Sequence, residues 1–237
     1  MSGERAPVSA RQRTGRPRAD ARPLEREPRE EIVAVASRLF AERGVAATTM
    51  SEIARRSGLR QSSVYYYFRD KEQILEEILA SVNRVVLDHL ARVNAEGGSP
   101  ALRLYRLVRL DVLQICAFPY DINEIYRLST LQEERFQRFW AERRELNRQV
   151  AALVAEGVRE GELAAVDPRL AALTLLANDE ATQNWHRPVG TLRQLEDEDY
   201  TPAEIAEFMA DLALGALVAD RRRLPAIRGE ARRRDPA

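Results

Sequence analysis

The chain has 237 residues, of which 45% are hydrophobic and 31% charged, and its 37 basic and 37 acidic residues balance to no net charge. This hydrophobic content suffices for a substantial core, and the sequence lacks an apolar run long enough for a transmembrane span. The single cysteine, Cys116, excludes an internal disulfide and a Cys-rich zinc site, so neither a metal nor a cofactor is expected. An Arg-rich N-terminus without the apolar segment of a secretory signal predicts a cytoplasmic protein with no membrane partner.

Arginines gather at the two ends of the chain. Residues 1–29 hold eight arginines against four acids, and residues 221–237 hold seven against two. A disordered basic tail is expected over residues 1–27, which lack apolar periodicity, and another over residues 223–237. Within the first tail, Thr14-Gly-Arg-Pro-Arg18 resembles an AT-hook core that lies in a narrow minor groove. A solvated tail with general attraction to phosphate is the alternative.

Residues 28–80 are predicted to form a small three-helix domain. The first helix spans residues 30–43, where apolar side chains recur at helical spacing, and Gly44 ends it. Thr49 and Glu52 then form a capping box that begins a second helix. A tight turn follows and leads into a third helix.

The turn and the third helix carry the functional signal. Gly58 lies where the chain must turn sharply, and a helix follows from about Gln61 to Phe68 with Val64 on its inner face. A helix, a short glycine-containing turn and a polar second helix form the helix-turn-helix arrangement, whose second helix enters the major groove of DNA. Tyr66 is expected to pack or to lie at the domain edge. The side chains expected to contact base edges or phosphates are Thr49, Arg60, Gln61, Ser62, Ser63, Tyr65, Tyr67 and Lys71.

This stretch resembles the DNA-binding domain of the TetR (tetracycline-repressor-like) family over roughly residues 29–80. The resemblance rests on Thr48-Thr-Met-Ser-Glu-Ile-Ala54, Gly58-Leu59, Val64-Tyr-Tyr-Tyr-Phe68 and Asp70-Lys-Glu72. Arg60 departs from it, because the family often has Ser or Thr there as the helix cap. The resemblance implies an all-α fold, with an N-terminal three-helix helix-turn-helix domain followed by a six-helix ligand-binding and dimerisation bundle. The alternative for the stretch alone is a solvated helical hairpin in an ordinary all-α protein.

Residues 71–94 are predicted to form a long helix that links the two domains. Its apolar stripe includes Val85 and His89, and so much apolar surface must contact two bodies. The second domain, residues 81–222, is expected to contain further helices. Their predicted ranges are 101–118, 121–129, 131–161, 168–187 and 202–220.

Two helices of the second domain are expected to form the homodimer. Helices 168–187 and 202–220 carry small residues that permit close contact with the same helices of a partner. Packing within one chain is the alternative. These small residues are Ala177, Ala181, Ala213, Gly215 and Ala216.

The resemblance also implies a chamber for a small molecule among the C-terminal helices. Aromatic walls with a few polar groups suit an organic ligand, although each aromatic residue alone also fits an ordinary core. The stretch Asn184-Trp-His-Arg-Pro188 resembles family members that sense acyl-CoA thioesters, because an arginine there would pair with a phosphate. The candidate pocket residues are His89, Tyr105, Phe118, Tyr126, Phe136, Trp140, Asn178, Asp179 and Trp185.

The sequence therefore predicts a ligand-responsive regulator that binds a palindromic operator in double-stranded DNA. We expect a repressor that a small hydrophobic or acyl-CoA-like effector releases. A DNA-organising protein that ignores ligands is the alternative. An enzyme is disfavoured because the two histidines, His89 and His186, lie on different predicted helices, and the sequence has no Gly-x-Gly-x-x-Gly, no P-loop and no His-Glu-x-x-His motif.

Overall fold

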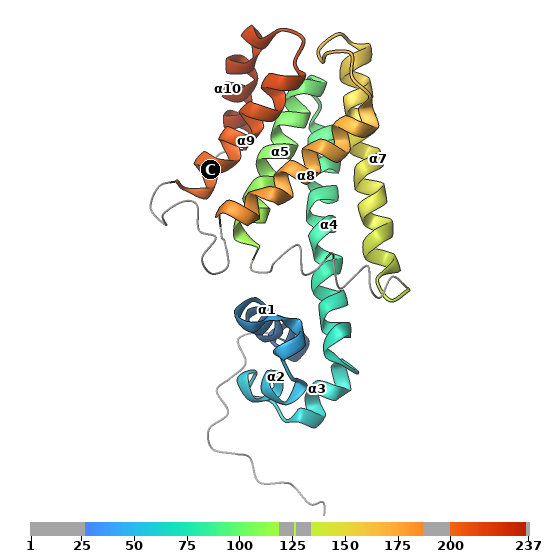
Figure 1. Ribbon diagram of the computed structural model, residues 1–237, viewed down its shortest axis with the longest axis vertical. Helices are drawn as coiled ribbons and strands as arrows, with labels where there is room; N and C mark the ends of the chain where they lie inside the picture. The colour runs from blue at the N-terminus through green and yellow to red at the C-terminus, as the bar shows by residue number, and fades with distance from the viewer. Residues whose placement is uncertain (1–26, 119–125, 127–133, 187–199, 236–237) are drawn as a thin grey trace, which may run out of the picture.

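The computed structural model describes residues 27–118, 126, 134–186 and 200–235 (Figure 1). Within these ranges the chain is helical, and the β structure is limited to one isolated bridge between Leu163 and Val218. A small N-terminal unit lies at one end of the molecule, and a long helix connects it to a bundle at the other end. None of the helices in the described part is both long and apolar enough to cross a membrane. The tail over residues 1–26 and the predicted helix 121–129, apart from residue 126, lie outside the described residues.

Three helices form the N-terminal unit: α1 (Pro28–Ala47), α2 (Met50–Arg56) and α3 (Gln61–Tyr67). Gly44 interrupts α1 with φ of 79°, and Gly58 turns the chain between α2 and α3 with φ of 66°, a conformation that glycine adopts without strain. The apolar faces meet in one core, as the helical periodicity predicts. Its most buried members include Ile32, Leu39, Ile53, Val64 and Phe68.

Helix caps agree with the sequence signals in part. The Thr49 hydroxyl oxygen accepts a hydrogen bond from the backbone N–H of Glu52 at 3.2 Å, so Thr49 caps α2. The Glu52 carboxylate turns to Arg43 and Arg55 instead, so only half of the predicted capping box forms. The complete capping box occurs later, between Thr201 and Glu204.

Two long helices, α4 (Lys71–Glu96) and α7 (Gln137–Arg159), belong to both halves of the molecule. The first turns of α4 lie in the N-terminal core and its later turns in the core of the bundle. The start of α7 follows the same pattern, because Phe136 and Phe139 are buried in the N-terminal core. Val85, expected on the apolar stripe of α4, is instead 41% exposed. The helix predicted to start near residue 131 begins at Gln137, with Phe136 as its N-cap residue.

The bundle is built around α5 (Pro100–Ala117). This helix packs against α4, α7, α8 (Pro168–His186), α9 (Pro202–Leu217) and the C-terminal helix, and most of its residues are buried. A helix that buries residues on nearly every side is stable only when neighbours surround it. The architecture confirms the predicted all-α fold, with an N-terminal helix-turn-helix domain and a C-terminal bundle.

The expected C-terminal tail is wrong for residues 223–235. A short 3-10 helix, η2 (Arg221–Arg223), leads into α10 (Leu224–Arg234), which packs on α5 and α9. Although the segment is rich in arginine, it also contains Ile227 and Ala231, which are one helical turn apart and buried against the bundle. Asp211 and Glu207 of α9 pair with two arginines of α10, Arg228 and Arg232. Asp235 in turn accepts from Arg106 of α5, whose side chain is fully buried, at 2.6 Å.

Candidate functional site

The helix α3 presents a polar outer face. Val64 and Phe68 are fully buried beneath it, whereas Gln61 and Ser62 are exposed and Ser63 is half-buried. Side chains at these positions carry hydrogen-bond donors and acceptors of the kind that read base edges or hold phosphates. The exposed face of α3 therefore has the shape and chemistry of a recognition helix.

Tyrosines extend this face toward the end of α3. Tyr65 is 48% exposed, and Tyr67 is half-buried with its ring edge-on to Tyr66 at 5.1 Å between centroids. Tyr66 itself is 83% exposed, so of the two expectations for it burial in the core is wrong, and a position at the edge of the domain agrees with the structure. Three tyrosines in succession cannot all point inward on a short helix, because residues one position apart lie about 100° apart around the axis. Tyr66 joins the candidate DNA contacts.

Arginines flank the recognition helix at both ends. Arg60 is exposed and takes the N-cap position of α3 without a side-chain cap bond, so its guanidinium is directed to solvent. Arg69 is exposed just after the helix, and Thr49 is exposed at the start of α2. These groups surround α3 with positive charge and donors suited to phosphates.

Lys71 has a different role from the predicted phosphate contact. Its ammonium group donates to the backbone oxygens of Val45, Ala46 and Thr48 at 2.7, 2.9 and 3.0 Å. An ammonium has three N–H donors, and all three are used. Lys71 therefore fastens the end of α1 to the start of α4. The sequence motif drew attention to the residue, but its partners come from a distant segment.

A second surface is apolar and exposed. Leu170 and Leu173 of α8 are 66% and 53% exposed, and Phe208 and Leu212 of α9 are 63% and 58% exposed. The groove between α8 and α9 is lined mainly by apolar side chains. Exposed apolar side chains gathered on two adjacent helices mark a protein contact surface. This surface coincides with the two helices that the sequence assigns to dimerisation.

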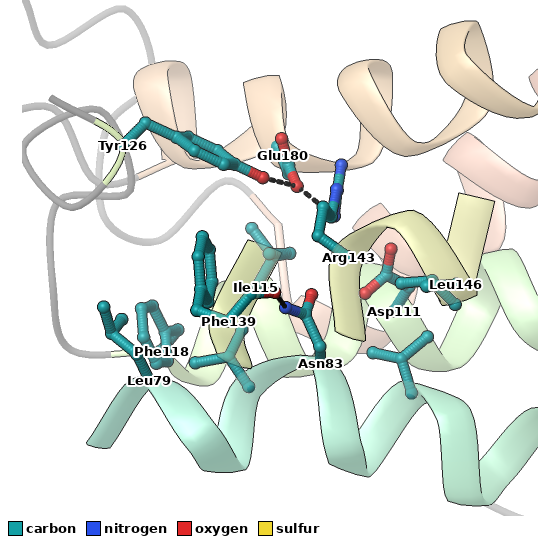
Figure 2. A pocket seen from close by; sticks show the side chains of 12 residues that line it. Leu79, Asn83, Asp111, Ile115, Phe118, Tyr126, Phe139, Arg143, Leu146 and Glu180 are labelled. Carbon is teal, nitrogen blue, oxygen red and sulfur yellow. Dashed lines mark hydrogen bonds and ion pairs between the residues drawn. The ribbon is translucent and has the colours of Figure 1, made fainter. Parts of the chain in front are cut away.

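A cavity of about 30 Å³ lies inside the bundle, where α4, α5, α7 and α8 meet (Figure 2). Its size allows about one or two water molecules. Apolar side chains form most of the wall, and five polar side chains reach it from every surrounding element. The lining residues are Leu79, Val82, Asn83, Val86, Asp111, Ile115, Phe118, Tyr126, Phe139, Arg143, Leu146 and Glu180.

One hydrogen-bonded group crosses this cavity. The Tyr126 hydroxyl donates to Glu180 at 2.6 Å, and the guanidinium of Arg143 lies 2.6 Å from the same carboxylate oxygen (Figure 2). The same guanidinium is 5.9 Å from the centroid of the Tyr126 ring, within range of a cation–π contact. On the opposite wall, Asn83 donates to the backbone oxygen of Phe139 at 3.2 Å.

Burial perturbs the acids around the cavity. Removal from water raises the pKa of Asp111 to about 7, against an opposing effect from the Arg143 guanidinium. Asp179 is buried and hydrogen-bonded to Asp111. Its burial, followed by the neighbouring Asp111, raises the pKa of Asp179 well above its usual value. Burial also raises the pKa of Glu180. A hydrogen bond between two carboxyls requires a proton, so the acid pair holds at least one.

Only some of the predicted pocket residues lie at or near the cavity. Phe118 and Tyr126 line the cavity, whereas Asp179 lines the groove between α8 and α9 and is hydrogen-bonded to Asp111 of the cavity wall. Trp140 packs against the Tyr126 ring at 5.7 Å between centroids, while Phe136 belongs to the core of the DNA-binding domain.

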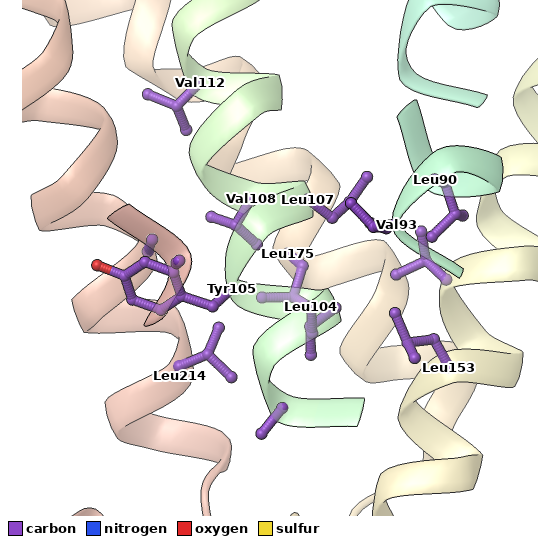
Figure 3. Packing of buried hydrophobic residues seen from close by; sticks show 14 of the residues in the cluster. Leu90, Val93, Leu104, Tyr105, Leu107, Val108, Val112, Leu153, Leu175 and Leu214 are labelled. Carbon is purple, nitrogen blue, oxygen red and sulfur yellow. The ribbon is translucent and has the colours of Figure 1, made fainter. Parts of the chain in front are cut away.

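The remaining predicted pocket residues lie elsewhere. Tyr105 faces α9, where its hydroxyl donates to Asp211 at 3.0 Å (Figure 3). His89 is buried and bonds Arg92 through Nδ1 at 2.8 Å, and burial lowers its pKa. Asn178 is exposed on the outer face of α8, and Trp185 is half-buried against the bundle core.

The sequence analysis missed the polar residues that distinguish this cavity. Asp111 had a usable signal, since it is the one acid in an otherwise apolar and basic helix. Glu180 and Arg143 had none, because they resemble the many solvated charges of α7 and α8. Their meeting depends on how separate helices pack.

An ion-pair group connects the cavity wall to the recognition helix. Arg135, just before α7, pairs with Asp70 at 2.5 Å and also with Glu76. Asp70 caps α4 and lies two residues beyond the C-cap of α3. Phe139 and Arg143, one turn apart on α7, line the cavity. The cavity-lining helix α7 and the segment just before it therefore reach the start of α4, two residues beyond the C-cap of α3.

Comparisons with known proteins agree across both domains. A sequence model described as bacterial regulatory proteins of the tetR family matches residues 32–78, and one described as a tetracyclin repressor-like C-terminal domain matches residues 97–217. The HTH-type transcriptional regulator TtgR of Pseudomonas putida is 31% identical over 161 residues, which cover 64% of this chain and 76% of TtgR. The HTH-type transcriptional repressor KstR2 of Rhodococcus jostii is 28% identical over 169 residues, covering 69% of this chain and 82% of KstR2.

A solved structure of a TetR/AcrR-family regulator is also similar to this chain. A transcriptional regulator of the TetR/AcrR family from Thermobifida fusca has a TM-score of 0.62 and 32% sequence identity, covering 78% of this chain and 96% of its own. The family matches span the helix-turn-helix unit and most of the bundle. The resemblance in the recognition motif is thus confirmed, and the chain belongs to the TetR family of transcriptional regulators.

Proposed function

We propose that this protein is a cytoplasmic, homodimeric repressor that leaves a palindromic operator when a small hydrophobic effector enters the cavity of its bundle. The observation that carries the proposal is that α4 and α7 both line this cavity and both reach the core of the DNA-binding domain. A change in the cavity therefore reaches α3 through two helices. The proposed activity is binding and release, not catalysis.

The DNA side of the proposal rests on α3. Two copies of this helix, one from each subunit, enter successive major grooves about 34 Å apart, so a palindrome is the matching sequence. Gln61 and Ser62 read base edges, while Tyr67, Arg60 and Thr49 hold phosphates. Any change in the separation of the two helices weakens binding at both half-sites.

The dimer rests on the apolar surface of α8 and α9. Two copies of this surface bury one another around a two-fold axis and form a four-helix interface. The exposed positions Phe208 and Leu212 are one turn apart on α9, and Leu170 and Leu173 follow one face of α8. The small residues Ala177 and Ala216 are also exposed on these helices and allow the subunits to approach closely.

The size of the cavity supports a switch. A cavity of about 30 Å³ is far smaller than the roughly 300 to 1,000 Å³ that a drug-sized ligand occupies. An effector enters only when the walls move apart, and two of these walls are α4 and α7. A hundredfold loss of operator affinity needs only about 2.7 kcal/mol of preference for the widened state.

An acyl-CoA thioester is the second candidate effector, suggested by the stretch around Asn184 and Trp185. The arginine and proline of that stretch, residues 187 and 188, lie outside the described residues. Within the cavity, Asp111 and Glu180 repel a polyanion, which favours a hydrophobic effector without negative charge. A DNA-organising protein without a ligand remains the alternative.

Gel-shift and footprinting assays on the DNA flanking the coding sequence test the proposal. A repressor protects one short palindrome and releases it when an effector is added. Protection without sequence preference, together with no response to any cavity ligand, would support the DNA-organising alternative and exclude the proposed function.

A further inference from the structure

We propose that the effector carries a positive charge, as a hydrophobic ammonium ion held between the acids Asp111 and Glu180 and the rings of Tyr126 and Phe139. This inference rests on the proposed function, because it assigns a chemical class to the ligand of the same cavity. The contacts, burial and charge of the described residues around the cavity carry it.

Acids outnumber cations around this cavity. Asp111 of α5 and Glu180 of α8 line it, Asp179 of α8 is hydrogen-bonded to Asp111, and the one guanidinium among the described lining residues is that of Arg143 on α7. This guanidinium is already paired with Glu180 at 2.6 Å. The remaining polar groups at the wall, Asn83 and the Tyr126 hydroxyl, are neutral.

Asp111 and Asp179 lack a cation of their own. They are 5% and 2% exposed, and within the described part of the chain neither forms an ion pair with an arginine or lysine. Each has the other as its hydrogen-bond partner, although Asp111 also lines the cavity. A buried carboxyl normally has a cation, a metal ion or several N–H donors beside it. A ligand ammonium in the cavity supplies the missing charge.

The aromatic side of the cavity already holds a cation. The guanidinium of Arg143 lies 5.9 Å from the centroid of Tyr126 while it pairs with Glu180. Phe139 and Trp140 extend this aromatic wall, with centroids 6.0 and 5.7 Å from that of Tyr126. Ring faces attract cations. A ligand ammonium therefore competes with Arg143 for a place that already suits a positive charge.

Displacement of Arg143 also explains how the ligand would change the conformation of the protein. When an ammonium ion takes the Glu180 carboxylate, Arg143 must leave it, and Arg143 lies on α7, one turn beyond Phe139. Asn83 of α4 is bonded to the backbone of Phe139, so a shift of α7 is transmitted to α4. An anion of the same size meets Asp111 and Glu180 with no free cation nearby and gains none of these contacts.

The test uses three ligands of one shape and different charge: 4-phenylbutylammonium, 4-phenylbutanol and 4-phenylbutyrate. Each is titrated into the full-length protein by isothermal calorimetry. We expect the ammonium ion to bind about tenfold or more tightly than the alcohol, because it gains a buried charge partner, and the carboxylate to bind most weakly. Equal affinities, a preference for the carboxylate, or no binding of the ammonium ion would overturn the inference.

Two variants assign the effect to the cavity. Asp111→Asn and Glu180→Gln keep the shape of the side chain and remove the charge, so each should reduce ammonium affinity about tenfold while leaving alcohol affinity unchanged. Asp88→Asn, on the exposed face of α4, is the matched control and should change neither. If Asp111→Asn and Glu180→Gln both bind the ammonium ion as the wild type does, the acids do not select the ligand.

Proton release gives an independent readout. An ammonium ion at Asp111 displaces the proton of the acid pair into the buffer, so the calorimetric enthalpy depends on the ionisation enthalpy of the buffer. Because burial raises the pKa of Asp111 to about 7, ammonium affinity should rise between pH 6 and pH 8. Arg143, Glu180 and Asp179 face the same group and set how steep the rise is. A buffer-independent enthalpy contradicts this part.

An operator assay separates the two proposals. If the ammonium ion binds as expected but operator affinity does not change, the charge preference holds and the proposed function fails. If 4-phenylbutyrate binds and releases the operator, the proposed function holds and the inference on charge fails.

Discussion

The stability of the protein should depend on pH through Asp111, and Asp111→Asn should remove this dependence. The substitution keeps the size of the side chain and the ability to hydrogen-bond with Asp179. It replaces a group that is neutral or charged according to pH with one that is always neutral. The two proteins should therefore differ most where the wild-type carboxyl has to ionise.

The direction follows from the raised pKa. Burial raises the pKa of Asp111 from 3.8 to about 7, so the folded protein binds this proton more tightly than the unfolded chain does. The stabilisation is fully present below pH 4 and is lost as the pH rises through about 7. The interval of about three pKa units corresponds to roughly 4 kcal/mol, as an upper limit for a single carboxyl.

Urea unfolding at pH 5, 6, 7 and 8, at a fixed protein concentration, measures the effect. The variant should already be more stable than the wild type at pH 5, by roughly 1.5 kcal/mol, and the difference should grow to at most about 4 kcal/mol at pH 8. Asp88→Asn, an exposed carboxylate on α4, should follow the wild type at every pH. A variant that is less stable than the wild type at pH 8 would refute the reasoning, because it would mean that the charged Asp111 is stabilised in the fold.

Four further predictions concern the other parts of the molecule. Lys71→Met should lower the free energy of unfolding by about 2 kcal/mol, since three backbone carbonyls lose a charged donor. It should leave the salt dependence of operator binding unchanged, and a weaker salt dependence in the variant would show that Lys71 contacts a phosphate after all. Tyr67→Phe should weaken operator binding about tenfold across different sequences in gel shifts, whereas loss of binding to one sequence alone would indicate base reading. Leu212→Glu should give monomers at micromolar concentration by light scattering, because a charge then lies in the apolar interface, and an intact dimer would place the interface elsewhere. Arg135→Gln should leave operator and ligand affinities within about threefold of the wild type but reduce ligand-induced release, measured by gel shift with ligand; full release would exclude coupling through Asp70.

The sequence predicts best what depends on neighbouring residues. Thr49, Gly58 and the alternation of buried and exposed positions around Val64 act within a few residues, and the structure places them as expected. The cap at Thr201 follows the same rule. Local signals of this kind suffice for the helix-turn-helix unit and for most helix boundaries.

Partners that lie far apart in the sequence explain the differences. The sequence motif predicts that Lys71 contacts phosphate, but in the fold the backbone at the end of α1 lies beside it and accepts its hydrogen bonds. The cavity brings Asp111, Arg143 and Glu180 together from separate helices, and nothing in the local context of Arg143 or Glu180 distinguishes them from ordinary surface charges. The sequence analysis predicted a disordered tail in place of α10 because this segment is rich in arginine. The acids that pair with Arg228 and Arg232 lie on α9 and come close only in the folded bundle.

The buried guanidinium of Arg106 makes the last described turn of the chain necessary for the rest. Asp235 neutralises it from α10, at 2.6 Å, and also pairs with Arg92 of α4 at 3.3 Å. Cleavage ahead of α10 would leave Arg106 beside Glu96 alone, at a cost of about 3 kcal/mol or more for a buried charge that loses a partner. Clipped copies would therefore unfold first and be degraded first, so the amount of active regulator in a cell would depend on whether its C-terminal helix is intact.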